Sequence, residues 1–346
     1  MGQREPVLIL GGTGQAGAGA AALLRRWHPT LPLTIAGRDP ERARRLADEL
    51  GHATAATVDL RRRDLGLPAT TACSAVVAAL WDDRLHGLRY ARERGVPYLS
   101  ISSGLVDIAP EIVAGTQRAE AAPILVASHF CAGAVVLAAL HAAREFDRID
   151  TVRIGAVLDE QDTGGPAGAA DLERWSTATT AGLVRRDGVF TWVDGPDAEA
   201  EVRRADGTGL PGRSIAVLDV PSLALATDAP DVRFDFAVGE STGRRLGGPA
   251  SFEAGVEIEG TDRAGAPTRT LRRLTHPSGQ RPVTATGVAL GVERLVGLRG
   301  AAVGPGLHTP EALLDPAYAV ERLAESGAVF TDVAAGRSSG AARSAS

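Results

Sequence analysis

The sequence predicts an α/β protein in which a doubly wound parallel sheet is joined to a second, α+β domain with a mixed or antiparallel sheet. Through about residue 130, short apolar runs alternate with segments of helical period, the pattern of a parallel sheet with helical crossovers. Beyond residue 129 this gives way to alternating segments separated by glycine, proline and aspartate turns. A length of 346 residues also suits two domains better than one.

The first strand is predicted at residues 7–10, a short apolar run that leads into glycines and then into an alanine-rich helix through Trp27. Gly12, Gly14 and Gly17 form a G-x-G-x-x-G triplet between that strand and helix, the context in which this triplet binds a dinucleotide. The three glycines would allow a tight turn, close approach of a pyrophosphate, and close packing of the helix. We therefore predict a Rossmann-type domain. Its loop would contact the cofactor through Gly12, Thr13, Gly14, Gln15, Ala16 and Gly17.

The second strand, residues 33–36, is followed by Gly37 and Arg38, at the place that distinguishes the two nicotinamide cofactors. A site for NAD carries a carboxylate there for the ribose 2′-hydroxyl, whereas a guanidinium suits a 2′-phosphate. Asp39 precedes Pro40 and has the form of a helix N-cap. We therefore assign Gly37 and Arg38 to the cofactor site, Asp39 to capping, and NADP(H) as the cofactor.

Further strands are predicted at residues 56–58, 74–80, 98–102 and 124–127. Ligands of such sheets bind beyond the carboxyl ends of the strands, so residues at those ends become candidate cofactor contacts. They are Asp59, Leu60, Ala79, Leu80 and Ser102. For Asp59 a turn or helix cap is an equally simple interpretation. Tyr90 and Arg94 have the spacing of the short-chain dehydrogenase dyad, but with arginine in place of lysine, and are expected on an exposed helix face.

His129, after the sixth strand, is the best proton donor at these strand ends and is our candidate catalytic residue. The alternative is a histidine that is only hydrogen-bonded at a strand end. Cys131 is expected to be a small buried residue rather than a nucleophile. In the loop of residues 159–165, Asp159, Glu160 and Asp162 could bind a substrate amine, or the loop could be a solvated turn.

The second half is predicted to begin with a helix at residues 132–145 and a strand at 150–158. A helix containing Asp171, Trp175 and Leu183 follows, then strands at 232–238, 252–258 and 268–275 and a helix at 283–295. Thr309 is a plausible cap for one more helix. The predicted division is a dinucleotide-binding domain (1–127), a substrate and dimerisation domain (128–308), and a disordered tail (334–346).

Composition excludes several classes of protein. All 37 basic residues are arginine, which excludes a Walker phosphate loop, a Schiff-base enzyme and the Tyr-x-x-x-Lys dyad, because arginine stays protonated. A net charge of −5 argues against nucleic acid as a partner, and no apolar run is long enough for a membrane span. Two distant cysteines suit neither a disulfide framework nor a metal site, and no secretory pattern precedes the first strand, so we expect a cytoplasmic protein without a metal.

The chain resembles the saccharopine dehydrogenase-like family of NAD(P)-dependent oxidoreductases. The resemblance rests on GGTGQAG, AGRDPERARRLADELG, GVPYLSISS and, most specifically, GPGLHTPEALLDP near the C-terminus. It departs from the family pattern at residues 127–132, where AlaSerHisPheCysAla replaces a glycine- and proline-rich turn.

The resemblance implies that residues 309–333 return to the nucleotide domain, and that the intervening domain holds the substrate site and a homodimer contact. It also implies reduction of a C=N bond formed from an amine or amino acid and a carbonyl compound. The alternatives are an enoyl or carbonyl reductase on the same scaffold, and a binding protein that senses NADP without turnover.

Overall fold

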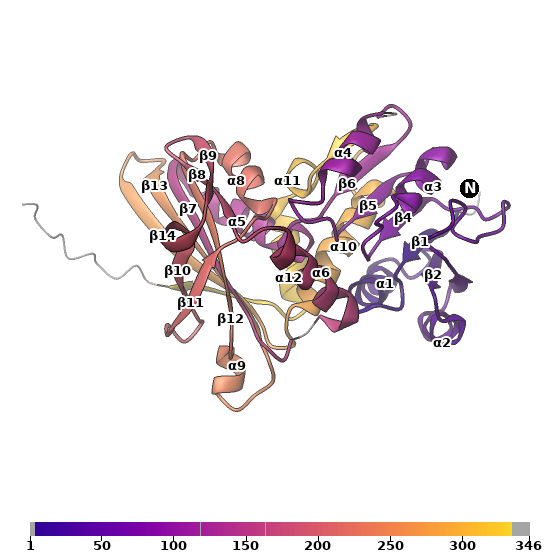
Figure 1. Ribbon diagram of the computed structural model, residues 1–346, viewed down its shortest axis with the longest axis horizontal. Helices are drawn as coiled ribbons and strands as arrows, with labels where there is room; N and C mark the ends of the chain where they lie inside the picture. Colours follow the sequence, from indigo (N-terminus) through magenta and orange to yellow (C-terminus); the bar gives the residue numbers. More distant parts are fainter. Residues whose placement is uncertain (1–3, 118, 163, 334–346) are drawn as a thin grey trace, which may run out of the picture.

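The structure, a computed structural model, describes residues 4–117, 119–162 and 164–333. The tail predicted at residues 334–346 lies outside this part of the chain. Two sheets lie side by side in Figure 1, each with its own helices. The predicted fold class, a doubly wound parallel sheet with a second mixed-sheet domain, is confirmed.

The first sheet has seven parallel strands in the order β15-β6-β5-β4-β1-β2-β3. Its strands are β1 (Val7–Leu10), β2 (Leu33–Gly37), β3 (Ala53–Thr57), β4 (Ala75–Ala78), β5 (Tyr98–Ser100), β6 (Pro123–Val126) and β15 (Gly306–His308). The helices between them are α1 (Gln15–Trp27), α2 (Pro40–Leu50), α3 (His86–Arg94) and α4 (Ala109–Thr116). In β1, Val7 and Ile9 pack into one core and Leu8 and Leu10 into another, so both faces are covered. The strand order reverses between β1 and β4, the point at which such sheets bind ligands.

The second sheet has nine strands, seven of them in the order β10-β11-β12-β7-β13-β14-β16; β8 pairs with β12, and β9 pairs with β8. They are β7 (Phe146–Leu158), β8 (Gly182–Arg186), β9 (Val189–Val193), β10 (Glu199–Arg203), β11 (Gly209–Ser214), β12 (Asp231–Val238), β13 (Phe252–Asp262), β14 (Pro267–His276) and β16 (Val329–Val333). Most neighbours are antiparallel, while β12 and β7 are parallel. Helices α5 (Ala134–Ala143) and α8 (Asp219–Thr227) share the core beneath this sheet.

The chain crosses between the sheets more than once. Helix α10 (Arg281–Leu295) packs against α1 and shares the core of the first sheet, and β15 pairs with β6 at its edge. After the short α11 (Pro310–Leu313), α12 (Pro316–Glu325) packs on α5 and β16 pairs with β14 in the second sheet. Helix α10 and β15 thus belong with the first sheet. Of residues 309–333, which were expected to return to it, Leu313 packs against the core of the first sheet, whereas β16 pairs within the second sheet.

Several local expectations differ from the structure. The helix predicted to include Leu183 is α6 (Gly165–Ala178), and Leu183 lies in β8. Strands β8 to β11 and the short helices α7 (Gly195–Ala198) and α9 (Thr242–Arg245) were not predicted. Tyr90, expected on an exposed face, is buried, and the Arg94 guanidinium carbon lies 3.4 Å from its ring centroid. Within the described residues, no helix is long and apolar enough to span a membrane.

Candidate cofactor and substrate site

The glycine loop joins β1 to α1 at the reversal of strand order. Gly12 and Gly17 are required by packing, because a Cβ would lie 2.8 Å from the Ile9 carbonyl oxygen at Gly12 and 2.5 Å from the Gly11 carbonyl oxygen at Gly17. At Gly14 a Cβ would meet only the Gly11 carbonyl oxygen, at 3.1 Å, and Gly14 is exposed. Gly14 is also the N-cap of α1 and offers no side-chain cap to the amides of the first turn. The loop therefore leaves open space beside unpaired N–H groups, which is what a pyrophosphate needs.

The end of β2 carries two exposed guanidinium groups. Arg38 makes no hydrogen bond or ion pair within the described residues. Asp39 caps α2 by accepting from the Glu41 and Arg42 amides at 3.0 and 3.1 Å, as predicted. The Arg42 side chain donates to the Thr13 carbonyl oxygen of the glycine loop at 3.2 Å. The capping carboxylate is thus engaged, while two cations lie beside the loop.

At the end of β3, the Asp59 carboxylate is held by Arg61. It accepts from the Arg61 backbone N–H at 3.0 Å and from the guanidinium at 2.9 and 3.0 Å, which holds the pKa of the carboxyl near 2. This geometry is that of the turn-cap interpretation. The Leu60 carbonyl oxygen accepts from His86 Nδ1 at 2.8 Å. Ala79 and Leu80 lie on the other side of β1. A Cβ at Gly11 would be 2.9 Å from the Ala79 carbonyl oxygen and 3.0 Å from the Leu80 side chain, so both residues border the glycine loop.

The ends of β5 and β6 form a buried polar layer. Ser103 Oγ donates to Glu111 at 2.6 Å and Ser100 Oγ donates to the same carboxyl. Burial raises the pKa of Glu111 although both hydroxyls oppose the shift. The Ser103 amide donates to Ser128 Oγ at 3.1 Å. These bonds fix the loop after β5 to the end of β6.

Arg174, from α6, connects the second half of the chain to these strand ends. Its guanidinium donates to the Ser102 carbonyl oxygen at 2.6 Å, to Asp107 at 2.7 Å and to Asp171 at 2.8 Å. The guanidinium carbon also lies 4.0 Å from the centre of the Trp81 ring. Because its donor groups are bonded to residues of both segments, Arg174 holds α6 against the residues that follow β4 and β5.

His129 follows β6 as predicted, but its side chain has no exposed surface. Nε2 lies 2.7 Å from Ser222 Oγ on α8 and 3.9 Å from Glu311, and Nδ1 has no partner within the described residues. Burial lowers the pKa of the imidazole, with Glu311 opposing the shift. In this conformation the ring faces α8 and α11, not the open strand ends, and the geometry is that of the purely hydrogen-bonded alternative.

Asp219 lies in the same buried cluster. Its Oδ2 accepts from the Phe130 amide at 2.8 Å, its Oδ1 has no partner within the described residues, and burial raises its pKa to about 7. Between His129 and α5 the chain makes a turn in which Cys131 and Ala132 have φ of 52° and 54°. Such left-handed residues cost of order 1 to 3 kcal/mol each and persist where the surroundings hold them. Cys131 is buried, as expected.

In the acidic loop of residues 159–165, two of the three carboxylates accept hydrogen bonds from other parts of the protein. Asp159 accepts from the Ser241 amide at 2.7 Å and from Arg244 at 2.9 Å, and its pKa is lowered to about 2. Asp162 accepts from the Gln280 amide, Glu160 is exposed, and Thr163 lies outside the described residues. At the end of the loop, the Gln15 amide can pair with the Gly164 carbonyl and the Gly165 amide, both at 3.3 Å. The loop thus lies against the glycine loop, and only Glu160 retains a free carboxylate among its described acids.

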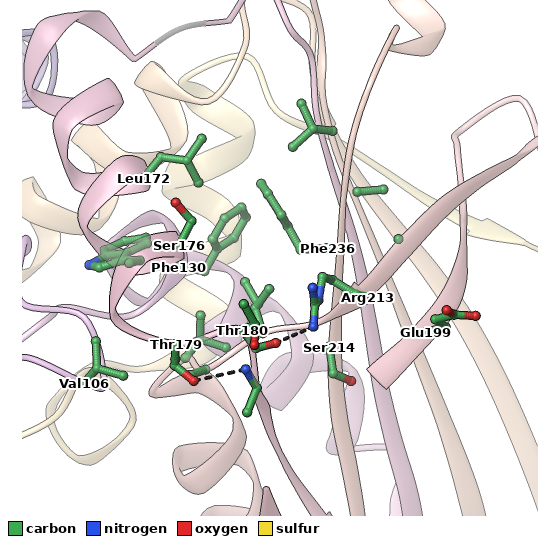
Figure 2. Close-up of a pocket in the computed structure, with 18 of the residues that line it drawn as sticks. Val106, Phe130, Leu172, Ser176, Thr179, Thr180, Glu199, Arg213, Ser214 and Phe236 are labelled. Carbon is green, nitrogen blue, oxygen red and sulfur yellow. Dashed lines mark hydrogen bonds between the residues drawn. The ribbon is translucent and has the colours of Figure 1, made fainter. Parts of the chain in front are cut away.

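A cavity of about 740 Å³ lies between α6 and the second sheet (Figure 2). Its walls are mainly apolar and include Phe130, Leu172, Trp175, Val217 and Phe236. Sequence reasoning missed this cavity, Arg174 and Arg42. Arg42 lies in the first turn of α2, four residues after Arg38, and could have been found from its place in the sequence. Arg174 and the cavity depend on packing between distant segments. Within the described residues, no group of three His, Cys, Asp or Glu side chains could hold a metal ion.

Comparison with known proteins informs the fold. No protein-family profile matches the sequence, and no curated protein is similar to it. Saccharopine dehydrogenase (L-Glu forming) from Saccharomyces cerevisiae has a similar structure, with a TM-score of 0.65 at 13% identity over 95% of this chain and 100% of that one. The chain therefore has a saccharopine dehydrogenase-like fold, as the sequence motifs predicted.

Two other solved structures are less similar. Dihydrodipicolinate reductase from Paenisporosarcina sp. TG-14 has a TM-score of 0.44 at 14% identity, covering 88% of this chain and 97% of that one. A myo-inositol dehydrogenase from Corynebacterium glutamicum has a TM-score of 0.43 at 16% identity, covering 96% and 100%.

Proposed function

We propose that this protein is an NADP(H)-dependent oxidoreductase that reduces the C=N bond of an imine formed from an amine or amino acid and a carbonyl compound. The observation that carries the cofactor assignment is the open glycine loop at the reversal of strand order, beside Arg38, which has no partner in the described part of the chain. The imine as the reducible group is carried over from the family that the sequence motifs and the fold resemble.

The residues fit this cofactor. Space at Gly14 and the free amides of the first turn of α1 would accept the pyrophosphate. Arg38, assisted by Arg42, would bind the 2′-phosphate, because neither guanidinium is paired with a carboxylate of residues 4–117, 119–162 and 164–333. Asp59 does not compete for the ribose, since its carboxylate is bound to Arg61. Ala79, Leu80 and Ser102 would border the nicotinamide end.

Reduced nicotinamide, when bound, supplies the hydride that is added to the imine carbon. The chain's own residues position the reactants and exclude water, and Arg174 does so by holding α6 over the strand ends. No protein proton donor is needed, because a protonated imine already carries the proton that remains on nitrogen. This agrees with the burial of His129, which we propose acts by fixing the turn after β6.

The test is NADPH consumption with amines and carbonyl compounds supplied singly and together. We expect consumption only when both are present, and more slowly with NADH. Consumption with a carbonyl or enoyl compound alone would replace the proposal by the corresponding reductase. Tight NADPH binding without turnover of any pair would replace it by a nucleotide sensor. The Gly14→Val protein serves as the control that cannot hold the cofactor.

A further inference from the structure

The cavity between α6 and the second sheet has the size of a site for a small organic molecule, since such sites occupy roughly 300 to 1,000 Å³. Its deeper walls are aromatic and aliphatic. The Phe130 and Phe236 ring centroids are 5.8 Å apart in an edge-on arrangement, and both rings line the cavity (Figure 2). The two charged lining residues, Arg213 and Glu199, are both exposed. A ligand enclosed here would therefore bury apolar surface.

One wall of this cavity comes from the loop that follows β5, the strand whose carboxyl end leads to Ser102, a proposed cofactor contact. Val106, from the loop after β5, is one of its lining residues. Trp175 is another, and its indole edge lies so close to Gly104 of the same loop that a Cβ at Gly104 would collide with Nε1. Trp175 also follows Arg174, which is bonded to Ser102 at the end of β5. A single helix thus presents one side to the strand ends and the neighbouring side to the cavity.

The apolar lining differs from what a polar, doubly charged substrate would need. A carboxylate buried without a partner costs several kcal/mol, and the described cation of the lining, Arg213, is exposed and donates to the Thr180 carbonyl oxygen. The remaining polar groups of the lining are mainly hydroxyls, such as those of Ser176 and Thr179. Such walls select an aliphatic chain or a ring over a dicarboxylate.

We propose that this cavity is the substrate pocket, and that it takes a substrate whose non-reacting part is an extended aliphatic chain. The inference rests on the proposed function for the reaction performed at its entrance, but the pocket's preference can be measured by binding alone. An apolar pocket of this size would favour long-chain carbonyl substrates over small or dicarboxylic ones.

The test compares binding of dodecanoate, butanoate and glutarate to the full chain by calorimetry, without cofactor. Each buried methylene favours binding by roughly fourfold, so dodecanoate should bind at least about 100-fold more tightly than butanoate or glutarate. Ser176→Trp should fill the cavity from α6 and weaken dodecanoate binding by about tenfold or more. Thr177→Trp is the matched control: Thr177 is also exposed on α6, and its hydroxyl also donates to the Glu173 carbonyl oxygen, but it does not line the cavity.

Leu172→Glu, also at an exposed lining position, provides a second variant should Ser176→Trp fail to fold; it places a charge at the apolar wall and should weaken dodecanoate binding similarly. Equal affinity for the three acids, or an equal effect of Ser176→Trp and Thr177→Trp, would overturn the pocket assignment. The two proposals fail separately. Strong dodecanoate binding without NADPH consumption by any amine and carbonyl pair contradicts the proposed function alone. Turnover of short or dicarboxylic carbonyl compounds as fast as dodecanal contradicts this inference alone.

Discussion

Replacing Arg38 by alanine should remove most of the preference for NADPH over NADH. Arg38 is exposed at the end of β2 and has no partner within the described residues, so its removal leaves no protein group unpaired and should not alter folding. A hydrogen bond to a charged group contributes about 1.5 to 3 kcal/mol, and exposure places this one at the lower end. We therefore expect NADPH to bind roughly tenfold more weakly, with NADH affinity unchanged.

Arg42 provides a second test of the assignment of these arginines to the 2′-phosphate. Within the described residues its guanidinium donates to the Thr13 carbonyl oxygen alone, at 3.2 Å, and we expect it to turn toward a phosphate bound by the neighbouring Arg38. The Arg38→Ala/Arg42→Ala protein should lose roughly 100-fold in NADPH affinity if the two effects add. Arg44→Ala is the control, because Arg44 is exposed on the same helix but paired with Glu41 at 3.0 Å.

Fluorescence titration with both cofactors at low and high salt measures these effects. The difference between NADPH and NADH should shrink as salt screens the exposed guanidinium groups. Equal affinities of the unmodified protein for the two cofactors would refute the assignment of NADP(H). Loss of NADH binding in the double variant would show that the arginines act on the loop and not on the 2′-phosphate.

The remaining predictions concern the glycine loop and the buried cluster. Gly14→Val should abolish NADPH binding with little change in Tm, because its side chain would enter open space beside a single backbone oxygen; circular dichroism and titration measure this, and affinity within a few-fold of the original would contradict it. His129→Asn should lower the free energy of unfolding by about 1 to 3 kcal/mol through loss of the Ser222 bond, with kcat nearly unchanged; a 100-fold fall in kcat at constant NADPH affinity would instead establish a catalytic role. Asp219 binds its proton more tightly in the folded than in the unfolded chain, so its contribution to stability is complete below about pH 4 and is lost as pH rises to about 7, a difference of about 4 kcal/mol at most. In Asp219→Asn that loss should be absent. Denaturant titrations give the free energy of unfolding of both proteins between these pH values, and the same pH dependence in the two proteins would contradict the raised pKa.

Much of the first sheet could be predicted because its signals are local. The strand at residues 7–10, the helix through Trp27 and the capping of α2 by Asp39 each follow from a few adjacent residues, and the structure has them at the predicted places. The second sheet was predicted only in part. Strand β11 contains Pro211 and two glycines, and β8 ends in two arginines, so neither shows the apolar alternation that identifies a strand. They are strands because their neighbours pair with them: β11 lies between β10 and β12, and β8 lies between β9 and β12.

The candidate site shows the same contrast between features set by adjacent residues and features set by contacts between distant segments. The glycine loop and Arg38 could be placed from the sequence because each lies in a short turn directly after a strand, β1 or β2, that its own residues identify. His129 was placed correctly at the end of β6, but α8 had not been predicted, and it is α8 that brings Ser222 against the imidazole and encloses it. Arg174 bonds to a carbonyl 72 residues away. A helical period indicates that Arg174 has a preferred face, but not which distant strand that face meets.

The interleaving of the two sheets has a consequence for how the protein is made. A ribosome releases β1 through β6 early, yet the helix that covers one face of that sheet and the strand that completes its edge come from residues 281–308. The side chains of Leu99 and Leu125 stay uncovered until α10 has been synthesised, because Gly291 of α10 lies against both of them. One face of the first sheet is therefore not covered until most of the chain has emerged. A nascent chain halted near residue 130 should remain protease-sensitive, and a gene fragment that ends there should yield aggregated protein, whereas co-expression with the complementary fragment should restore soluble material.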